Sequence, residues 1–230
     1  MISSITLLGF VCVLLGMTSS LEIKIAVILP FDDARLFGDR KIAPAIEVAR
    51  DRLKEDQILL NSTTIVVHYE DSQCDIAHGI NKAIKLYMDH EVHVFLGPVC
   101  DFAVAPVARQ SRFWNLPVVS GGAMAREFAL FKNTTYSHLT RVGPVNFHSL
   151  SKLIELIFIH FKWKRLKLLY EGTGQDKYVT GFCHLATEAV HYNLLDKGAP
   201  IQQDYFRLDG IKDYAEMLSK EVAQDYASRW

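Results

Sequence analysis

Apolar segments with the length of buried strands alternate with helical segments along this chain. Four strands are expected before residue 121, at 23–29, 64–69, 92–96 and 117–120. The stretches between them place apolar residues on one helical face, at 42–53, 76–87 and 101–113. Regular alternation of this kind predicts an α/β fold, in which a mostly parallel sheet carries helices on both faces.

The pattern restarts after Pro144, beyond a loop that contains Gly121 and Gly122 and an extended stretch at 136–142. The second unit should hold helices at 147–161, around 182–189 and from about 211, with strands at 166–170 and 201–206. It stops where a further buried strand is expected. We therefore predict doubly wound parallel sheets in two lobes, a complete first lobe at 21–143 and a partial second lobe at 144–230.

The N-terminal segment has the features of a signal peptide. Residues 5–17 are a short apolar stretch, and Thr18 and Ser20 are small residues suited to signal peptidase cleavage. The alternative is an N-terminal membrane anchor, for which about 20 apolar residues are needed. We predict a signal peptide at 1–20 and an extracellular chain, with N-glycosylation at Asn61 and Asn133.

Cysteine use fits that compartment. Cys12 leaves with the signal peptide, so an odd number remains: Cys74, Cys100 and Cys183. In an oxidising compartment Cys74 and Cys100 are the natural pair, and closing this loop contributes roughly 3 to 4 kcal/mol. Cys183 is then either a buried free thiol or the partner of a cysteine elsewhere.

Three separated runs resemble a known receptor family. They are YEDSQC at 69–74, FLGPVCDFAVAPVAR at 95–109 and YSHLTRVGP at 136–144. In this order and spacing, they closely resemble the extracellular domain of natriuretic peptide receptors, particularly the clearance-receptor type, and of related receptor guanylyl cyclases. The resemblance runs from about Glu22 to about Tyr226 and implies a type I periplasmic-binding-protein fold. It also implies that Cys183 pairs with a cysteine beyond Trp230, in a longer receptor.

The resemblance further implies a bound chloride. Receptors of this family hold the ion at the turn before a helix, with two backbone amides and a Ser hydroxyl. The matching positions here are Val99, Cys100 and Ser72, and the helix dipole favours an anion at such a place. Some relatives have Gly where this chain has Val99. The alternative for Ser72 is that its side chain caps a turn.

Peptide binding is implied at Phe102, Arg109 and Glu188, with Tyr170 as a weaker candidate. Arg109 offers a forked donor, Phe102 an aromatic contact, and Glu188 a charge complementary to a basic peptide. The alternative is structural: Phe102 as helix-packing core, and the other two as solvated charges. A homodimer is also implied, through helices at 76–89 and 102–113.

Met88 and Phe113 occupy expected contact positions in that dimer. Phe113 and Trp114 together would form an aromatic anchor, unless Trp114 packs inside the lobe.

The residues favour a receptor over an enzyme or a nucleic-acid-binding protein. The formal net charge is -1 and no long basic block occurs, which argues against nucleic acid. We find no GxSxG elbow or HExxH motif, the GTG at 172–174 lacks a third glycine, and His90 and His93 lack further metal ligands. We therefore predict no catalysis, metal or cofactor other than chloride.

The predicted function is capture of a peptide hormone at a dimer interface, where binding shifts the population of dimer arrangements. Attachment to a membrane would come only from a C-terminal segment outside this sequence. A parent with a cyclase domain stays open. The alternatives are a small-molecule sensor of the same fold, using the 120–122 turn and Arg141, and a secreted decoy or non-binding remnant.

Overall fold

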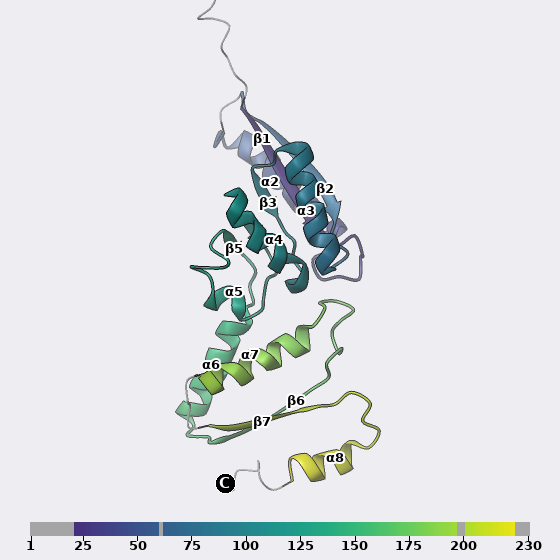
Figure 1. Ribbon diagram of the computed structural model, residues 1–230, viewed down its shortest axis with the longest axis vertical. Coiled ribbons are helices and arrows are strands. Elements are labelled where there is room, and N and C mark those ends of the chain that lie inside the picture. The colour runs from purple at the N-terminus through teal and green to yellow at the C-terminus, as the bar shows by residue number, and fades with distance from the viewer. Residues whose placement is uncertain (1–20, 60–61, 197–200, 224–230) are drawn as a thin grey trace, which may run out of the picture.

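A computed structural model describes residues 21–59, 62–196 and 201–223. The predicted signal peptide at 1–20 and the sequon at Asn61 lie outside these residues. Two parallel sheets, each with its own helices, form two lobes that follow one another along the long axis of the molecule (Figure 1). The α/β class predicted from the alternation is confirmed. Within the described residues, no helix is both long enough and apolar enough to cross a bilayer.

The first lobe is built on a five-stranded sheet in the order β2-β1-β3-β4-β5. Its strands, all parallel, are β1 (Glu22–Leu29), β2 (Thr64–Asp71), β3 (Val94–Leu96), β4 (Val118–Ser120) and β5 (Leu139–Arg141). Because β1 pairs with β2 on one side and β3 on the other, the strand order reverses there, as in doubly wound sheets.

The helices of this lobe are α2 (Asp39–Glu55), α3 (Ile76–His90), α4 (Asp101–Trp114) and the short α5 (Glu127–Leu130). Side chains of β1 alternate between the two faces of the sheet. Ala26 and Ile28 pack with α3 and α4, whereas Val27 and Leu29 pack towards α2. All four are at most 2% exposed, so this central strand is buried on both sides.

The second lobe has two parallel strands, β6 (Arg165–Tyr170) and β7 (Gln202–Arg207). On one face lie α6 (Phe147–His160) and α7 (Phe182–Asp196), and on the other lies α8 (Tyr214–Glu221) (Figure 1). Much of α6 is apolar yet exposed, at Leu150, Leu153, Leu156, Ile157 and Ile159. The apolar character predicted for this helix therefore has little cover within the described part of the chain.

Three expectations about the elements need correction. The short helix α5 was not predicted. Residues 136–138 form a turn and only β5 is extended, because Tyr136 folds back against Phe128, with ring centroids 4.8 Å apart. The last helix begins at Tyr214 and not near Ile211, since the Asp213 carboxylate accepts from the Glu216 amide and caps it.

Direct contacts join the two lobes through the first-lobe loop between β1 and α2. The Leu36 amide donates to the Tyr178 carbonyl at 3.1 Å, and the Arg35 guanidinium donates to the Asp176 carbonyl and the Thr180 hydroxyl. We call this set of contacts the Arg35 strap. The lobe boundary expected between residues 143 and 144 stays a prediction; β5 ends at Arg141 and α6 begins at Phe147.

Cys74 and Cys100 are joined by the predicted disulfide, with Cα atoms 5.3 Å apart. It ties the segment before α3 to the residue that precedes α4, and both cysteines are buried. Cys183 is a half-buried free thiol. Trp114 packs inside the lobe, stacked on Tyr87 with centroids 4.5 Å apart, so it is not part of an exposed aromatic anchor.

Replacing both Cys74 and Cys100 by Ala is expected to lower the free energy of unfolding by about 3 kcal/mol, because the unfolded chain loses a cross-link. Urea denaturation of both proteins measures this. Cys183→Ala, which breaks no bond, is the control and should shift the midpoint little. An unchanged midpoint in the double variant would contradict the expectation.

Candidate functional site

A groove lies where α4 and α5 of the first lobe face α7 of the second. It holds a cavity of about 600 Å³. Side chains from both lobes line it, among them Asp101, Phe102, Arg109, Tyr136 and Glu188. Three of the four residues predicted to bind a peptide therefore meet in one place.

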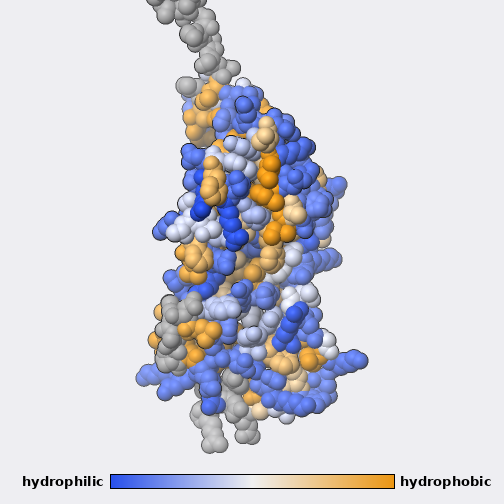
Figure 2. All heavy atoms as spheres, viewed as in Figure 1, coloured by the Kyte–Doolittle hydropathy of each residue, from blue (hydrophilic) through white to orange (hydrophobic). Residues whose placement is uncertain are grey.

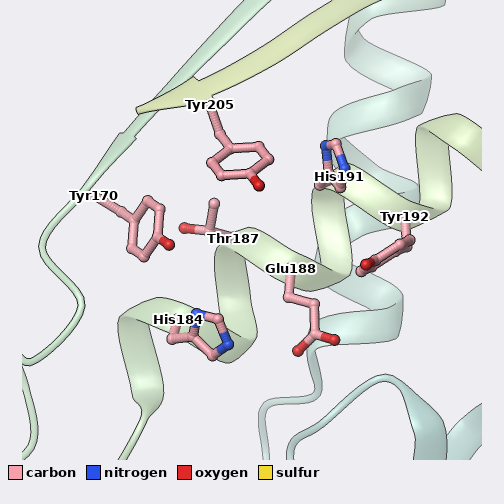
Figure 3. Close-up of a pocket in the computed structure, with 7 residues that line it drawn as sticks. All are labelled: Tyr170, His184, Thr187, Glu188, His191, Tyr192 and Tyr205. Carbon is pink, nitrogen blue, oxygen red and sulfur yellow. The ribbon is translucent and has the colours of Figure 1, made fainter. Parts of the chain in front are cut away.

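A smaller cavity of about 200 Å³ adjoins this groove in the second lobe, between α7 and the two-stranded sheet (Figure 3). We call it the α7 hollow. Its lining residues are Tyr170, His184, Thr187, Glu188, His191, Tyr192 and Tyr205. Glu188 and Tyr192 line both cavities, so Tyr170, the fourth predicted residue, belongs to the same continuous surface. Their contact with a ligand stays a prediction.

Arg109 is held in position by Tyr136. Its Nη2 and Nε donate to the Tyr136 hydroxyl at 2.8 and 3.1 Å, and the guanidinium carbon lies 5.5 Å from the ring centroid. Glu127 is 3.9 Å from Nη2. Burial raises the pKa of the Tyr136 hydroxyl, so it stays a neutral acceptor. The Arg109 side chain is nevertheless 55% exposed, and its guanidinium has further N–H donors that the bonds to Tyr136 do not use.

Phe102 combines packing with exposure. Its ring is 41% exposed, yet it lies against the turn that leads into α7. A Cβ at Gly181, where φ is +72°, would come within 2.8 Å of the ring. The aromatic side chain therefore contacts the second lobe and also presents a face to the groove, so it is not helix core alone.

Asp101 is the buried carboxylate of the groove. The residue is 3% exposed and its Oδ1 accepts from the Ala125 amide at 2.6 Å, while Oδ2 has no partner within the described structure. Burial raises the pKa of this carboxyl to about 6, opposed by the amides it accepts from and by the charge of Arg141. Asp101 is the first residue of α4, and Cys100, which precedes it, stands at the N-cap position without a side-chain capping bond.

The α7 hollow was missed except for Tyr170 and Glu188. Five of its residues, His184, Thr187, Glu188, His191 and Tyr192, follow the i, i+3, i+4, i+7 and i+8 spacing of one helical face. That polar and aromatic stripe was a readable signal. Tyr170 and Tyr205 come from the strands, which only the fold brings opposite α7 (Figure 3).

The predicted chloride residues also lie together. Ser72 is fully buried, and its Oγ accepts from the Cys74 amide at 3.3 Å, which leaves the hydroxyl proton free to donate. Val99 and Cys100 are both 6% exposed, directly before α4. The turn-capping alternative for Ser72 is thus present in the structure and is compatible with ion binding.

Among the remaining predicted positions, Asn133 is exposed in the turn after α5. His90 stacks on His68 with centroids 3.9 Å apart, and His93 accepts from the Lys24 amide through Nδ1. Across the described residues, no group of three or more potential His, Cys, Asp or Glu ligands is gathered for a metal.

The fold and groove define a class: an α/β binding protein of two lobes, with a mixed aromatic and charged surface where they meet. Two comparisons with solved structures support the fold. A substrate-binding protein of an ABC transporter from Desulfitobacterium hafniense matches with a TM-score of 0.59 and 16% identity, over 83% of this chain and 52% of that one. A leucine binding protein, LivK, from Thermotoga maritima gives 0.52 and 16%, over 86% and 52%. The periplasmic-binding-protein-like fold is confirmed.

Sequence comparison places the chain more narrowly. Residues 41–226 match the model of the receptor family ligand binding region. Atrial natriuretic peptide receptor 3 of Rattus norvegicus is 34% identical over 203 residues, which are 84% of this chain and 36% of that receptor. Atrial natriuretic peptide receptor 2 of the same species is 31% identical over 157 residues, 67% of this chain and 15% of the receptor.

The chain belongs to this family of receptor ligand-binding regions, as its three sequence runs predicted. It spans about a third of the length of the receptor 3 relatives.

Asp101 predicts a pH dependence of stability. Because its pKa in the folded protein is raised to about 6, the fold favours the protonated carboxyl, and ionisation costs stability as pH rises from about 4 to above 6. Asp101→Asn removes this ionisation and keeps an acceptor for Ala125. Relative to the variant, the native chain should lose about 2 kcal/mol between pH 4 and pH 7.5.

Urea denaturation of both proteins across this range measures the difference. A constant gap between the two curves would contradict the prediction.

Proposed function

We propose that this chain is the extracellular ligand-binding region of a natriuretic-peptide-receptor-like hormone receptor, and that it captures a peptide without catalysing a reaction. The observation that carries the proposal is the joining of Phe102, Arg109, Glu188 and Tyr170 along one open groove and its adjoining hollow. Such a surface is long and exposed, and combines aromatic rings with both signs of charge. These are properties that suit a peptide.

A peptide ligand is favoured over a small molecule because the loops at the carboxyl ends of the first-lobe strands already make contacts of their own. The Arg35 strap bridges this edge to the second lobe. Ser120 is also engaged, donating to the Pro98 carbonyl at 2.8 Å and accepting from the Gly122 amide. The polar groups that a small-molecule sensor would use there are in part already satisfied.

We further propose that two chains associate through α3 and α4. Apolar side chains stand exposed on these helices, with Ile84 at 44%, Met88 at 70% and Phe113 at 71%. Figure 2 shows apolar side chains over this face of the first lobe, where Figure 1 places α3 and α4. Exposed apolar side chains gathered on one face are typical of protein interfaces. In such a dimer, a peptide between the chains would favour one arrangement over another.

Chloride binding at Ser72, Val99 and Cys100 is proposed as part of the same receptor. The free hydroxyl proton of Ser72 and the dipole of the 14-residue helix α4 favour an anion there. The site would stabilise the turn on which α4, and therefore Phe102 and Arg109, depends.

An extracellular location and glycosylation at Asn133 belong to the same proposal. The Cys74–Cys100 disulfide suits an oxidising compartment, and Asn133 is exposed.

Binding of atrial natriuretic peptide to the full chain, measured by isothermal titration calorimetry, tests the proposal. Arg109→Ala should weaken binding at least tenfold, because it removes a charged hydrogen-bond donor from the lining of the groove. Arg112→Ala is the matched control: this residue is on the same helix but outside the groove, bonded to the Thr134 carbonyl. Absence of saturable binding, or equal losses in both variants, would contradict the proposal.

Dimerisation is expected to be lost when Met88 and Phe113 are both changed to Lys, because two buried charges would then face the partner. Sedimentation velocity measures the change from dimer to monomer. Val48→Lys on α2 is the control, since Val48 is 55% exposed on the opposite face of the sheet. A chain that is monomeric before substitution, or a control with the same effect, would rule out this interface.

A further inference from the structure

The α7 hollow has the composition of a site for a cation. Three tyrosines line it, and Glu188 is its one acidic side chain among the described residues. The Tyr170 and Tyr205 ring centroids are 6.5 Å apart, and both rings face α7 from neighbouring strands (Figure 3). Aromatic faces attract guanidinium and ammonium groups, and a carboxylate at the rim adds charge.

Two histidines flank Glu188 on the same helical face. His184 lies four residues before it and His191 three residues after it. The His184 ring is 6.2 Å from that of Tyr170, and the His191 ring is 5.0 Å from that of Tyr205. Both imidazoles therefore line the hollow, each beside one of its tyrosines.

His191 carries an unused polar atom. Its Nδ1 is buried and has no hydrogen-bond partner within the described structure. Gln203 is next to it, because the Gln203 side-chain amide donates to the His191 carbonyl at 2.7 Å, and the Gln203 Oε1 is likewise buried without a partner. His191 Nδ1 and Gln203 Oε1 are therefore two buried polar atoms beside the hollow that no hydrogen bond of the described structure satisfies.

The other charged groups near the hollow are already paired. Asp204 of β7 interacts with the His191 charge but is bound to Lys167. Arg207 is opposite Tyr170 in the strand register and is paired with Asp209. In the adjoining groove, Arg109 lies 3.9 Å from Glu127. Glu188 and the two histidines therefore set the net charge of the hollow.

We propose that the α7 hollow binds one cationic side chain of the peptide, a guanidinium or an ammonium group, and that protonation of His184 and His191 on acidification expels it. The proposal rests on the peptide-binding function proposed above. In the range of about pH 5 to 8 histidine gains its charge, and two added positive charges beside Glu188 then oppose the bound cation.

The test uses Nα-acetyl-L-argininamide as the probe and its uncharged citrulline counterpart as the chemical control. Binding to the full chain is followed by NMR of tyrosine ring resonances at pH 7.5 and pH 5.5. We expect saturable binding of the arginine probe, about tenfold weaker at the lower pH, and none of the citrulline compound. Glu188→Gln should abolish binding of the probe.

Replacing both His184 and His191 by Gln should reduce the pH effect to less than twofold. His184→Gln alone, an exposed change that preserves folding, should remove part of it. His160→Gln on α6, outside the hollow, is the matched control and should keep the full effect. Equal binding of both probes, no binding, or a pH effect that survives the double substitution would overturn the proposal.

Atrial natriuretic peptide separates failure of this proposal from failure of the proposed function. If the peptide binds at pH 7.5 with the same affinity in Glu188→Gln and the native chain, the hollow is not its cation site, although the receptor function stands. If the peptide does not bind the native chain at all, the receptor function fails first.

Discussion

The turn between β3 and α4 is the constraint on which the rest of the molecule depends. Backbone from three strands converges here so closely that a Cβ at Gly122 would meet the Val99 carbonyl oxygen at 1.8 Å. The Cys74–Cys100 disulfide fixes this turn from one side, and the Asp101 carboxylate fixes it from the other by accepting from Ala125. Because α4 begins at this point, the turn sets where its first groove residues lie.

Much of the fold followed from apolar periodicity. The strand at 23–29 and the helix at 101–113 were predicted nearly to their ends, since the strand is buried on both faces and the helix places its apolar residues on one face. The turn at 136–138 could not be predicted, because its conformation depends on contacts of Tyr136 with Phe128 and Arg109 that are distant in sequence. Local propensity carries no information about such packing.

The candidate site was likewise predictable only in part from the sequence. Family resemblance supplied Phe102, Arg109 and Glu188 as positions, but the structure shows what two of them contact. The Phe102 ring lies against the second lobe, and the Arg109 guanidinium is oriented by the buried Tyr136 hydroxyl. The residues that α7 contributes to the hollow could be recognised from their helical spacing, but the residues on its opposite wall, which come from the strands, could not. Tyr205 belongs to a strand whose register with β6 only the folded lobe defines.

The Arg35 strap has a consequence for the groove that it does not touch. One wall of the groove is α4 in the first lobe and the other is α7 in the second, so the angle between the lobes sets its width. Arg35 and Leu36 hold that angle through bonds to the loop that leads into α7. In the proposed peptide complex, the lobe angle and the affinity for the peptide would therefore be coupled, and by reciprocity peptide binding would tighten or loosen the strap.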